Sequence, residues 1–123
     1  MSDSAATERP QLFVDGSWRD AHGGSVAVID SATEAVLGHA ALADQSDIDA
    51  AVLAARRALT GPWRTYSPRE RAEVLNAMAS VLKSRAVQTA ELVSRENGMP
   101  IALSLGANGY SPTAIFRYYA NLV

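Results

Sequence analysis

The fold of this chain is decided at residues 36–59, which read VLGHAALADQSDIDAAVLAARRAL. Within this stretch the apolar residues change from the alternation of a strand to the spacing of about 3.6 residues that forms a stripe along a helix. Residues 36–40 therefore predict a strand, whereas Ile48, Val52 and Leu59 belong to one apolar helical stripe. The chain is thus predicted to contain an N-terminal β unit followed by helices.

Short strands precede this transition. Residues 12–14 and 17–19 flank Asp15-Gly16, a pair that tolerates the positive φ of a tight hairpin turn. Gly23-Gly24 closes the hairpin, and residues 25–29 alternate and are rich in β-branched side chains, which favours a strand. Residues 12–41 are therefore predicted to form a small antiparallel β unit, preceded by a disordered segment at residues 1–11.

Helix start signals follow the β unit. Ser46, with Asp49 three positions later, is interpreted as the cap of the first helix, which Gly61-Pro62 ends. Ser67-Pro68-Arg69-Glu70 is a stronger signal, because a capping serine, a first-turn proline and a glutamate at the third position coincide. The second helix is predicted to run to about residue 85. Its core-facing residues are expected to be Leu75, Met78, Ala79 and Leu82.

Two further helices complete the predicted organisation. The third, about residues 86–97, ends at Asn97-Gly98, which suits a left-handed cap. Gly106 and Gly109 weaken the helical pattern and predict a loop. Ser111-Pro112 starts the last helix, whose apolar side is Ile115, Phe116, Tyr119 and Leu122.

Composition restricts the classes of function. The 123 residues have a formal net charge of -2 and no cysteine, which excludes disulfides, thiolate metal sites and thiol nucleophiles in this chain. No stretch approaches the roughly 18 consecutive apolar residues of a membrane span, and the N-terminus does not resemble a secretory signal. We expect a cytoplasmic protein that binds neither nucleic acid nor membrane.

Candidate chemical groups have plain structural explanations. His22 and His39 lack a carboxylate at informative spacing, so a hydrolytic triad is disfavoured against ordinary surface or strand residues. Asp44, Asp47 and Asp49 cluster before a helix, where capping is favoured over a metal site. The residue pattern alone predicts no catalytic, cofactor-binding or metal-binding residue.

Two other features have competing interpretations. Gly106 and Gly109 resemble part of a dinucleotide fingerprint, but they follow a helix and the third glycine is missing. The aromatic residues could stack nucleobases, yet no basic residues are interleaved with them, so core packing is favoured. These aromatic residues are Trp18, Trp63, Phe116, Tyr118 and Tyr119.

Several segments together resemble the aldehyde dehydrogenase superfamily, in matching order and spacing from Leu12 to Val123. Asp30-Ser31 replaces the more frequent Asn-Pro of the family, and Met99 stands where lysine is common. The matching segments are LFVDGSW (12–18), VIDSATE (28–34) leading to VLG (36–38), DIDAAV (47–52) with AAR (54–56), GPW (61–63), SPRERA (67–72), ENGMP (96–100) and RYYA (117–120).

The resemblance implies an α/β fold of which this chain is an incomplete part, the N-terminal portion of a Rossmann-like cofactor-binding domain at residues 12–123. Family members oxidise aldehydes to carboxylic acids with NAD or NADP through a cysteine thiohemiacetal. Their nucleophilic cysteine, glutamate base, oxyanion-stabilising asparagine and cofactor-phosphate segment correspond to positions beyond Val123. The chain alone is therefore expected to bind no cofactor and to be inactive.

The resemblance also suggests a monovalent-cation site, because some members use main-chain oxygens near Val28 and Ile29 and an acid at the place of Glu96. A surface acid beside a helix end is the favoured interpretation of Glu96. We expect the chain to self-associate or to pair with a longer aldehyde dehydrogenase chain, since its apolar helix faces lack a parallel sheet to cover them. The alternatives are a non-catalytic interaction module or split subunit, and an unrelated small helical binding domain.

Overall fold

The computed structural model describes residues 10–123, and these divide into two compact units. The first unit comprises the described residues up to Asp30 together with Glu34–Arg64, and the second comprises Ser31–Thr33 and Thr65–Val123. The sequence prediction for residues 1–9 lies outside the described part. The first strand begins at Gln11, one residue before the predicted hairpin.

The first hairpin of unit 1 consists of β1 (Gln11–Val14) and β2 (Ser17–Asp20), which pair antiparallel. Its two-residue turn has φ angles of 56° at Asp15 and 78° at Gly16, so both central residues adopt the left-handed conformation that favours Asp-Gly in hairpins. Phe13 and Trp18 are cross-strand partners, with ring centroids 5.1 Å apart in an edge-to-face arrangement. The predicted hairpin is confirmed.

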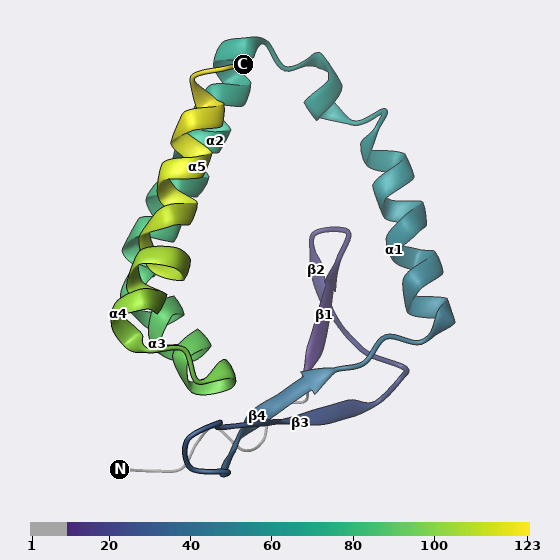
Figure 1. Cartoon of the computed structure of the whole chain (residues 1–123). Helices are drawn as coiled ribbons and strands as arrows, with labels where there is room; N and C mark the ends of the chain where they lie inside the picture. Colours follow the sequence, from purple (N-terminus) through teal and green to yellow (C-terminus); the bar gives the residue numbers. More distant parts are fainter. Residues whose placement is uncertain (1–9) are drawn as a thin grey trace. The chain divides into compact units, whose positions relative to one another are not determined.

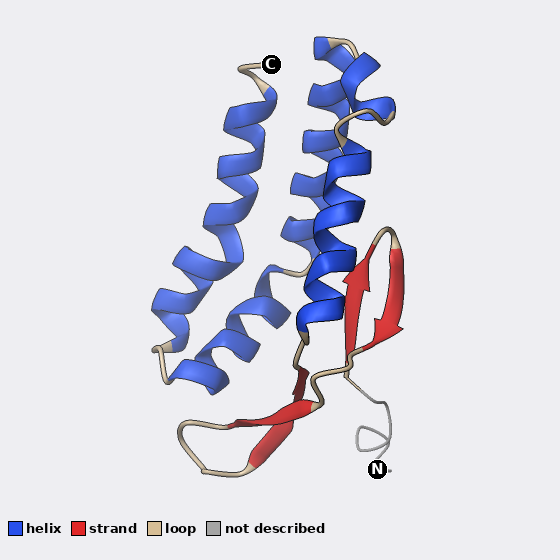
Figure 2. Ribbon diagram, turned by 90° about the vertical axis from the view of Figure 1, so that its right-hand side faces the viewer, coloured by secondary structure: helices blue, strands red, loops and turns tan. Residues whose placement is uncertain are grey.

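The second hairpin consists of β3 (Ser25–Ile29) and β4 (Val36–Ala41), with a register irregularity between Val28 and Ile29. It forms its own two-stranded sheet and is not hydrogen-bonded to the first hairpin, so the predicted β unit is two sheets (Figure 2). Gly23 approaches the backbone after β4 closely, because a Cβ there would lie 2.6 Å from the carbonyl oxygen of Leu42. Both sheets in the described part are antiparallel.

Helix α1 (Gln45–Ala58) is capped by Asp44, not by the predicted Ser46. Asp47 occupies the third helical position and completes a reciprocal capping box, which satisfies backbone N–H groups at the helix start. The prediction failed because the Ser46–Asp49 and Asp44–Asp47 pairs have the same spacing, and only the backbone conformation selects between them. After α1 the short 3₁₀ helix η1 (Pro62–Thr65) follows.

Unit 2 contains α2 (Pro68–Ser84) and α3 (Ala86–Asn97), joined at Arg85. The predicted capping box at the start of α2 is confirmed: the Ser67 hydroxyl accepts from the Glu70 N–H, and the Glu70 carboxylate accepts from the Ser67 N–H. Gly98 ends α3 with a φ of 75°, as the Asn97-Gly98 pair predicts. Helix α2 packs along α5 (Figure 1).

The last helical segment runs without a loop through α4 (Ile101–Ser104), the π-helical η2 (Leu105–Tyr110) and α5 (Ser111–Ala120). The loop predicted at Gly106 and Gly109 is therefore wrong. A Cβ on Gly109 would lie 2.8 Å from the carbonyl oxygen of Ala86, so this glycine permits close packing of η2 on α3. Packing within unit 2 thus outweighs the low helical propensity of glycine.

The buried core of the described residues consists of small side chains: Ala54 in unit 1, and Ala79, Ala86, Ala90 and Ala120 in unit 2. Several side chains predicted to be buried are exposed instead. Met78 is 45 % exposed, and the apolar stripe predicted for the first helix is exposed at Ile48 and Val52 of α1 and at Leu59, which follows its last residue. Core packing is also contradicted for four of the predicted aromatic residues, which are exposed: Trp18, Trp63, Tyr118 and Tyr119.

These exposed residues show that helical periodicity identified the apolar faces but not what covers them. Within residues 10–123 no helix combines the length and hydropathy required to cross a membrane.

Candidate functional site

A polar network at the start of α1 joins titratable side chains of unit 1 through hydrogen bonds. The Asp47 N–H donates to Oδ1 of Asp44 at 3.0 Å, and the Asp44 N–H donates to Oδ2 of Asp47 at 3.2 Å. The Ser46 hydroxyl also donates to Oδ1 of Asp44, at 2.7 Å. Two aspartates therefore lie together because each satisfies the backbone of the other at the helix start.

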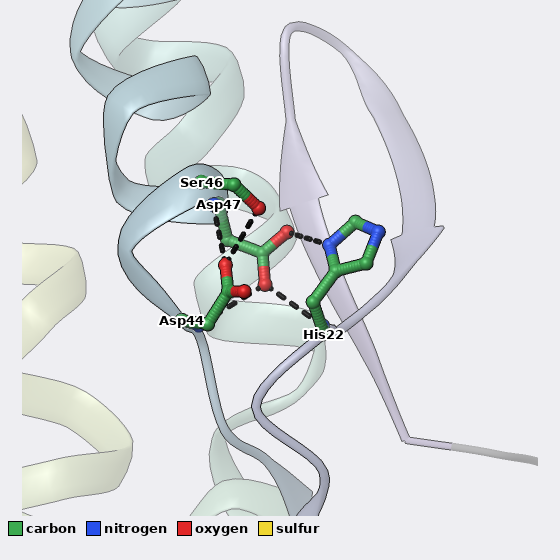
Figure 3. A network of polar contacts seen from close by, with 4 residues as sticks. All are labelled: His22, Asp44, Ser46 and Asp47. Atoms are coloured by element: carbon green, nitrogen blue, oxygen red, sulfur yellow. Dashed lines mark hydrogen bonds and ion pairs between the residues drawn. The ribbon is translucent and has the colours of Figure 1, made fainter.

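His22 joins this network from the connection between β2 and β3 (Figure 3). Its backbone N–H donates to Oδ2 of Asp47 at 2.9 Å, and its ring Nδ1 lies 2.7 Å from Oδ1 of Asp47. The Asp47 side chain is 1 % exposed, whereas the His22 side chain is 59 % exposed. A buried carboxylate is thus paired through both oxygens with a half-exposed imidazole and two backbone N–H groups.

The network shifts the titration of its members. The hydrogen bond to Asp47 raises the pKa of His22, and the charge of the same carboxylate adds to this effect. Hydrogen bonds from the backbone and ring of His22 lower the pKa of Asp47 to about 2. Near neutral pH the Asp47 carboxylate is therefore ionised and accepts hydrogen bonds only, so Nδ1 of His22 carries the proton between them.

The Ser46 hydroxyl lowers the pKa of Asp44, because it donates a hydrogen bond to the ionised carboxylate. Ser46 directs this hydroxyl at Asp44 and not at His22. A serine nucleophile activated by this histidine requires a hydrogen bond between the two side chains. The geometry therefore does not favour the hydrolytic-triad interpretation.

His22, Asp44 and Asp47 each offer one possible metal-ligand atom, and these atoms lie within 4.8 Å of one another. Both oxygens of Asp47 already accept N–H groups, and Nδ1 of His22 has its proton directed at this carboxylate. These atoms therefore already take part in the cap of α1 and in the hydrogen bonds that join this cap to the connection between β2 and β3. Capping accounts for the contacts between Asp44 and Asp47, and the two hydrogen bonds from His22 add a tie between Asp47 and the connection before β3.

The remaining sequence candidates lie elsewhere. Asp49 accepts a hydrogen bond from Gln45 at 2.9 Å on the exposed surface of α1, and His39 lies in β4 opposite Ala27. Glu96 is exposed in the last turn of α3. The structure therefore brings together only His22 with the Asp44–Asp47 pair.

Sequence reasoning missed the contact between His22 and Asp47 because 25 residues separate them. The spacing of three residues between Asp44 and Asp47 was the available signal for their mutual capping, since it is the spacing of a capping box.

An apolar groove of about 470 Å³ lies on unit 2 between α2 and α5. Five lining residues come from α2 and one from α5, and none carries a charge. They are Val74, Ala77, Met78, Val81, Leu82 and Phe116. This groove is a surface of unit 2 that suits apolar contact and offers no reactive group.

Comparison with known proteins gives a consistent result. A sequence model described as the aldehyde dehydrogenase family matches residues 18–123. A protein of Arabidopsis thaliana named aldehyde dehydrogenase family 2 member B4, mitochondrial, is 35 % identical over 122 residues, which are 98 % of this chain and 23 % of that protein. The aminoacetaldehyde dehydrogenase of Pseudomonas aeruginosa is 38 % identical over 98 % of this chain and 25 % of its own length.

Solved structures agree with the sequence relatives. The NAD+ complex of an aldehyde dehydrogenase from Bacillus cereus superposes with a TM-score of 0.87 at 32 % sequence identity, over 97 % of this chain and 25 % of that one. The chain therefore spans about a quarter of the length of the proteins that it matches.

Proposed function

Because this chain belongs to the aldehyde dehydrogenase family, we propose that it forms the N-terminal part of the cofactor-binding domain of an NAD(P)-dependent aldehyde dehydrogenase. The observation that carries the proposal is the extent of the match, which includes 98 % of this chain and only about a quarter of each relative. Its role in the oxidation of an aldehyde to a carboxylic acid is then structural, as one part of a larger enzyme.

The chain by itself is proposed to be catalytically inactive. Aldehyde oxidation through a covalent intermediate needs a nucleophile, and the 123 residues include no cysteine to form a thiohemiacetal. The coupled side chains of the polar network already bond to one another and to backbone N–H groups: Asp44 and Asp47 cap α1, and His22 is bound to Asp47. No proton transfer or hydride transfer is therefore assigned to this chain.

The two glycines that resemble part of a dinucleotide fingerprint do not form the turn that binds the phosphates. The fingerprint for that ligand is a glycine-rich turn between a strand and a helix, where N–H groups at the helix start bind phosphate. Gly106 and Gly109 lie in a continuous helical segment instead, and the space at Gly109 is occupied by the backbone of Ala86. NAD or NADP is thus proposed as the cofactor of the larger enzyme, held by residues outside this chain.

The proposed partner is a longer aldehyde dehydrogenase chain that covers the apolar groove between α2 and α5. Met78 and Val81 are 45 % and 54 % exposed at this groove, and apolar surface of this kind favours association. Self-association of the chain would cover the same side chains. Each arrangement removes apolar area from water, which is the physical reason to expect one of them.

Reassembly of an active enzyme tests the proposal. The chain is assayed for aldehyde-dependent formation of reduced nicotinamide, first alone and then after co-expression with the Bacillus cereus aldehyde dehydrogenase from which the matching N-terminal quarter has been deleted. We expect no turnover by the chain alone and turnover by the pair. Turnover by the chain alone, or a failure of the two pieces to associate, would contradict the proposal.

A matched pair of variants locates the contact. Met78→Glu combined with Val81→Glu places charge in the groove and should abolish association, because burying an unpaired carboxylate is costly. Lys83→Glu changes a charge on the exposed surface of the same helix and should leave association intact. Equal loss of association in both variants would show that the groove is not the contact surface.

The alternative function is a non-catalytic interaction module or split subunit that pairs with a separately encoded dehydrogenase. The same exposed groove supports it. Co-purification with an intact aldehyde dehydrogenase, without restored turnover in the truncated enzyme, would favour this alternative over the first proposal. A cytoplasmic location is also proposed for this chain, although the relative from Arabidopsis thaliana is named as mitochondrial. Imaging of the tagged full-length protein tests the location.

A further inference from the structure

The buried carboxylate of Asp47 connects two segments of unit 1 that are distant in sequence. One oxygen accepts the backbone N–H groups of His22 and Asp44, and the other contacts the ring of His22. Of these donors only the His22 ring changes its charge near neutral pH. The strength of the connection therefore depends on the protonation of one half-exposed side chain.

We infer that the contact between His22 and Asp47 is a proton-dependent latch, which fastens the connection between β2 and β3 to the first turn of α1. It loosens as the imidazolium of His22 becomes neutral, because Nδ1 keeps its proton but the ring no longer places a positive charge beside the carboxylate. The latch is defined here as the three hydrogen bonds that Asp47 accepts from His22 and Asp44. It lies wholly within unit 1 and is independent of the aldehyde dehydrogenase proposal.

The charged groups around His22 determine the direction of the response. Asp47 raises the pKa of His22 most strongly, and Asp44 at the start of α1 adds to this effect. Arg19 on β2 opposes it, because its positive charge disfavours a second positive charge nearby. The two aspartates outweigh Arg19, so the closed latch favours the imidazolium form.

Linkage then gives the sign of the effect. The pKa of His22 is higher in the closed latch than the value of 6.5 expected in the open chain. The extra stability is therefore complete below about pH 6.5 and is lost as the pH rises through the higher, folded value. The Asp47 carboxylate must stay ionised, which its pKa of about 2 ensures over this range.

The latch predicts a relation between two independent measurements on the full chain. The first is the midpoint of the His22 ring titration, followed by nuclear magnetic resonance in the folded protein and again in urea. The second is the hydrogen-exchange protection factor of the His22 amide, which donates to Asp47, below and above that midpoint. Protection should fall as the pH rises, by a factor of ten for each pH unit that separates the two midpoints.

Two histidine variants provide the matched comparison. His22→Gln removes the titrating ring and should abolish the pH dependence of protection at residue 22, whereas His39→Gln alters the other histidine, in β4, and should preserve it. Asp47→Asn should lower the His22 midpoint, because the carboxylate that raises the pKa of His22 most strongly is lost. The two measurements on the wild-type chain need no variant, so the proposal can be tested even if a substitution prevents folding.

The latch is overturned by any of three results. These are a His22 midpoint that is the same in the folded protein and in urea, protection that does not change across the His22 titration, and a pH dependence that persists in His22→Gln. A chain that does not fold in isolation would give the first of these results.

Discussion

Gly106 and Gly109 occupy the same π-helical segment but have different surroundings, so alanine at the two positions should have different effects on stability. A Cβ at position 106 meets no heavy atom within 4 Å, whereas a Cβ at position 109 would lie 2.8 Å from the Ala86 carbonyl oxygen. That neighbour is backbone and cannot rotate away. Gly109→Ala must therefore displace η2 from α3.

The expected difference in the free energy of unfolding follows from a comparison of the two variants. Replacing glycine by alanine at a helical position without a clash stabilises a protein by about 0.4–1 kcal/mol, because the unfolded chain becomes less flexible. This gain is shared by both variants and cancels in their difference. Overpacking of a closely packed site costs about 1–3 kcal/mol, and this remaining term is the expected gap in the free energy of unfolding.

Urea unfolding of the two variants and the wild type, followed by circular dichroism, measures the gap. With a urea m-value of about 1–3 kcal/mol per molar for small proteins, the midpoints of the two variants should differ by roughly 1 M. Gly106→Ala should lie above the wild type. Equal midpoints, or a higher midpoint for Gly109→Ala than for Gly106→Ala, would refute the assigned packing of η2 on α3.

Two further predictions concern the helix caps. Ser67→Ala removes the hydroxyl that accepts from the Glu70 N–H and should lower the free energy of unfolding by about 1 kcal/mol, measured by urea denaturation. Ser80→Ala, within the same helix, is the control and should cost less. Asp47 contributes stability above pH 3.8 that is lost as the pH falls toward its folded pKa of about 2. Asp47→Asn should therefore flatten the acid-unfolding curve between these values, and an unchanged curve would contradict the role of this carboxylate.

Local signals in the sequence predicted much of the secondary structure. The Asp15-Gly16 turn, the Ser67–Glu70 capping box and the Gly98 helix end all appear where the sequence placed them. Each depends on the conformational preference of a few consecutive residues, and tertiary contacts are not needed to recognise it. The family resemblance is also confirmed, since it rests on the order of such segments along the chain.

The same local signals predicted only part of the candidate site. Asp44 and Asp47 were recognised as cap residues of the first helix, but Ser46 was taken as the cap itself. The pairing of Asp47 with His22 joins residues 25 positions apart, and no local pattern marks one histidine as its partner over the other. The exposure of Met78 was missed for a related reason, because periodicity gives a helix an apolar face without saying what covers it.

By itself, the sequence determined the hairpin turn, the main helices, the family and the absence of a thiol nucleophile, because these follow from residue identity and short-range spacing. Only the tertiary structure decided that Gly106 and Gly109 continue a helix and that a buried aspartate ties His22 to α1. The physical reason is that packing distances and hydrogen bonds between remote residues depend on the folded backbone. The Ala86 carbonyl that contacts Gly109 has no counterpart in any local sequence pattern.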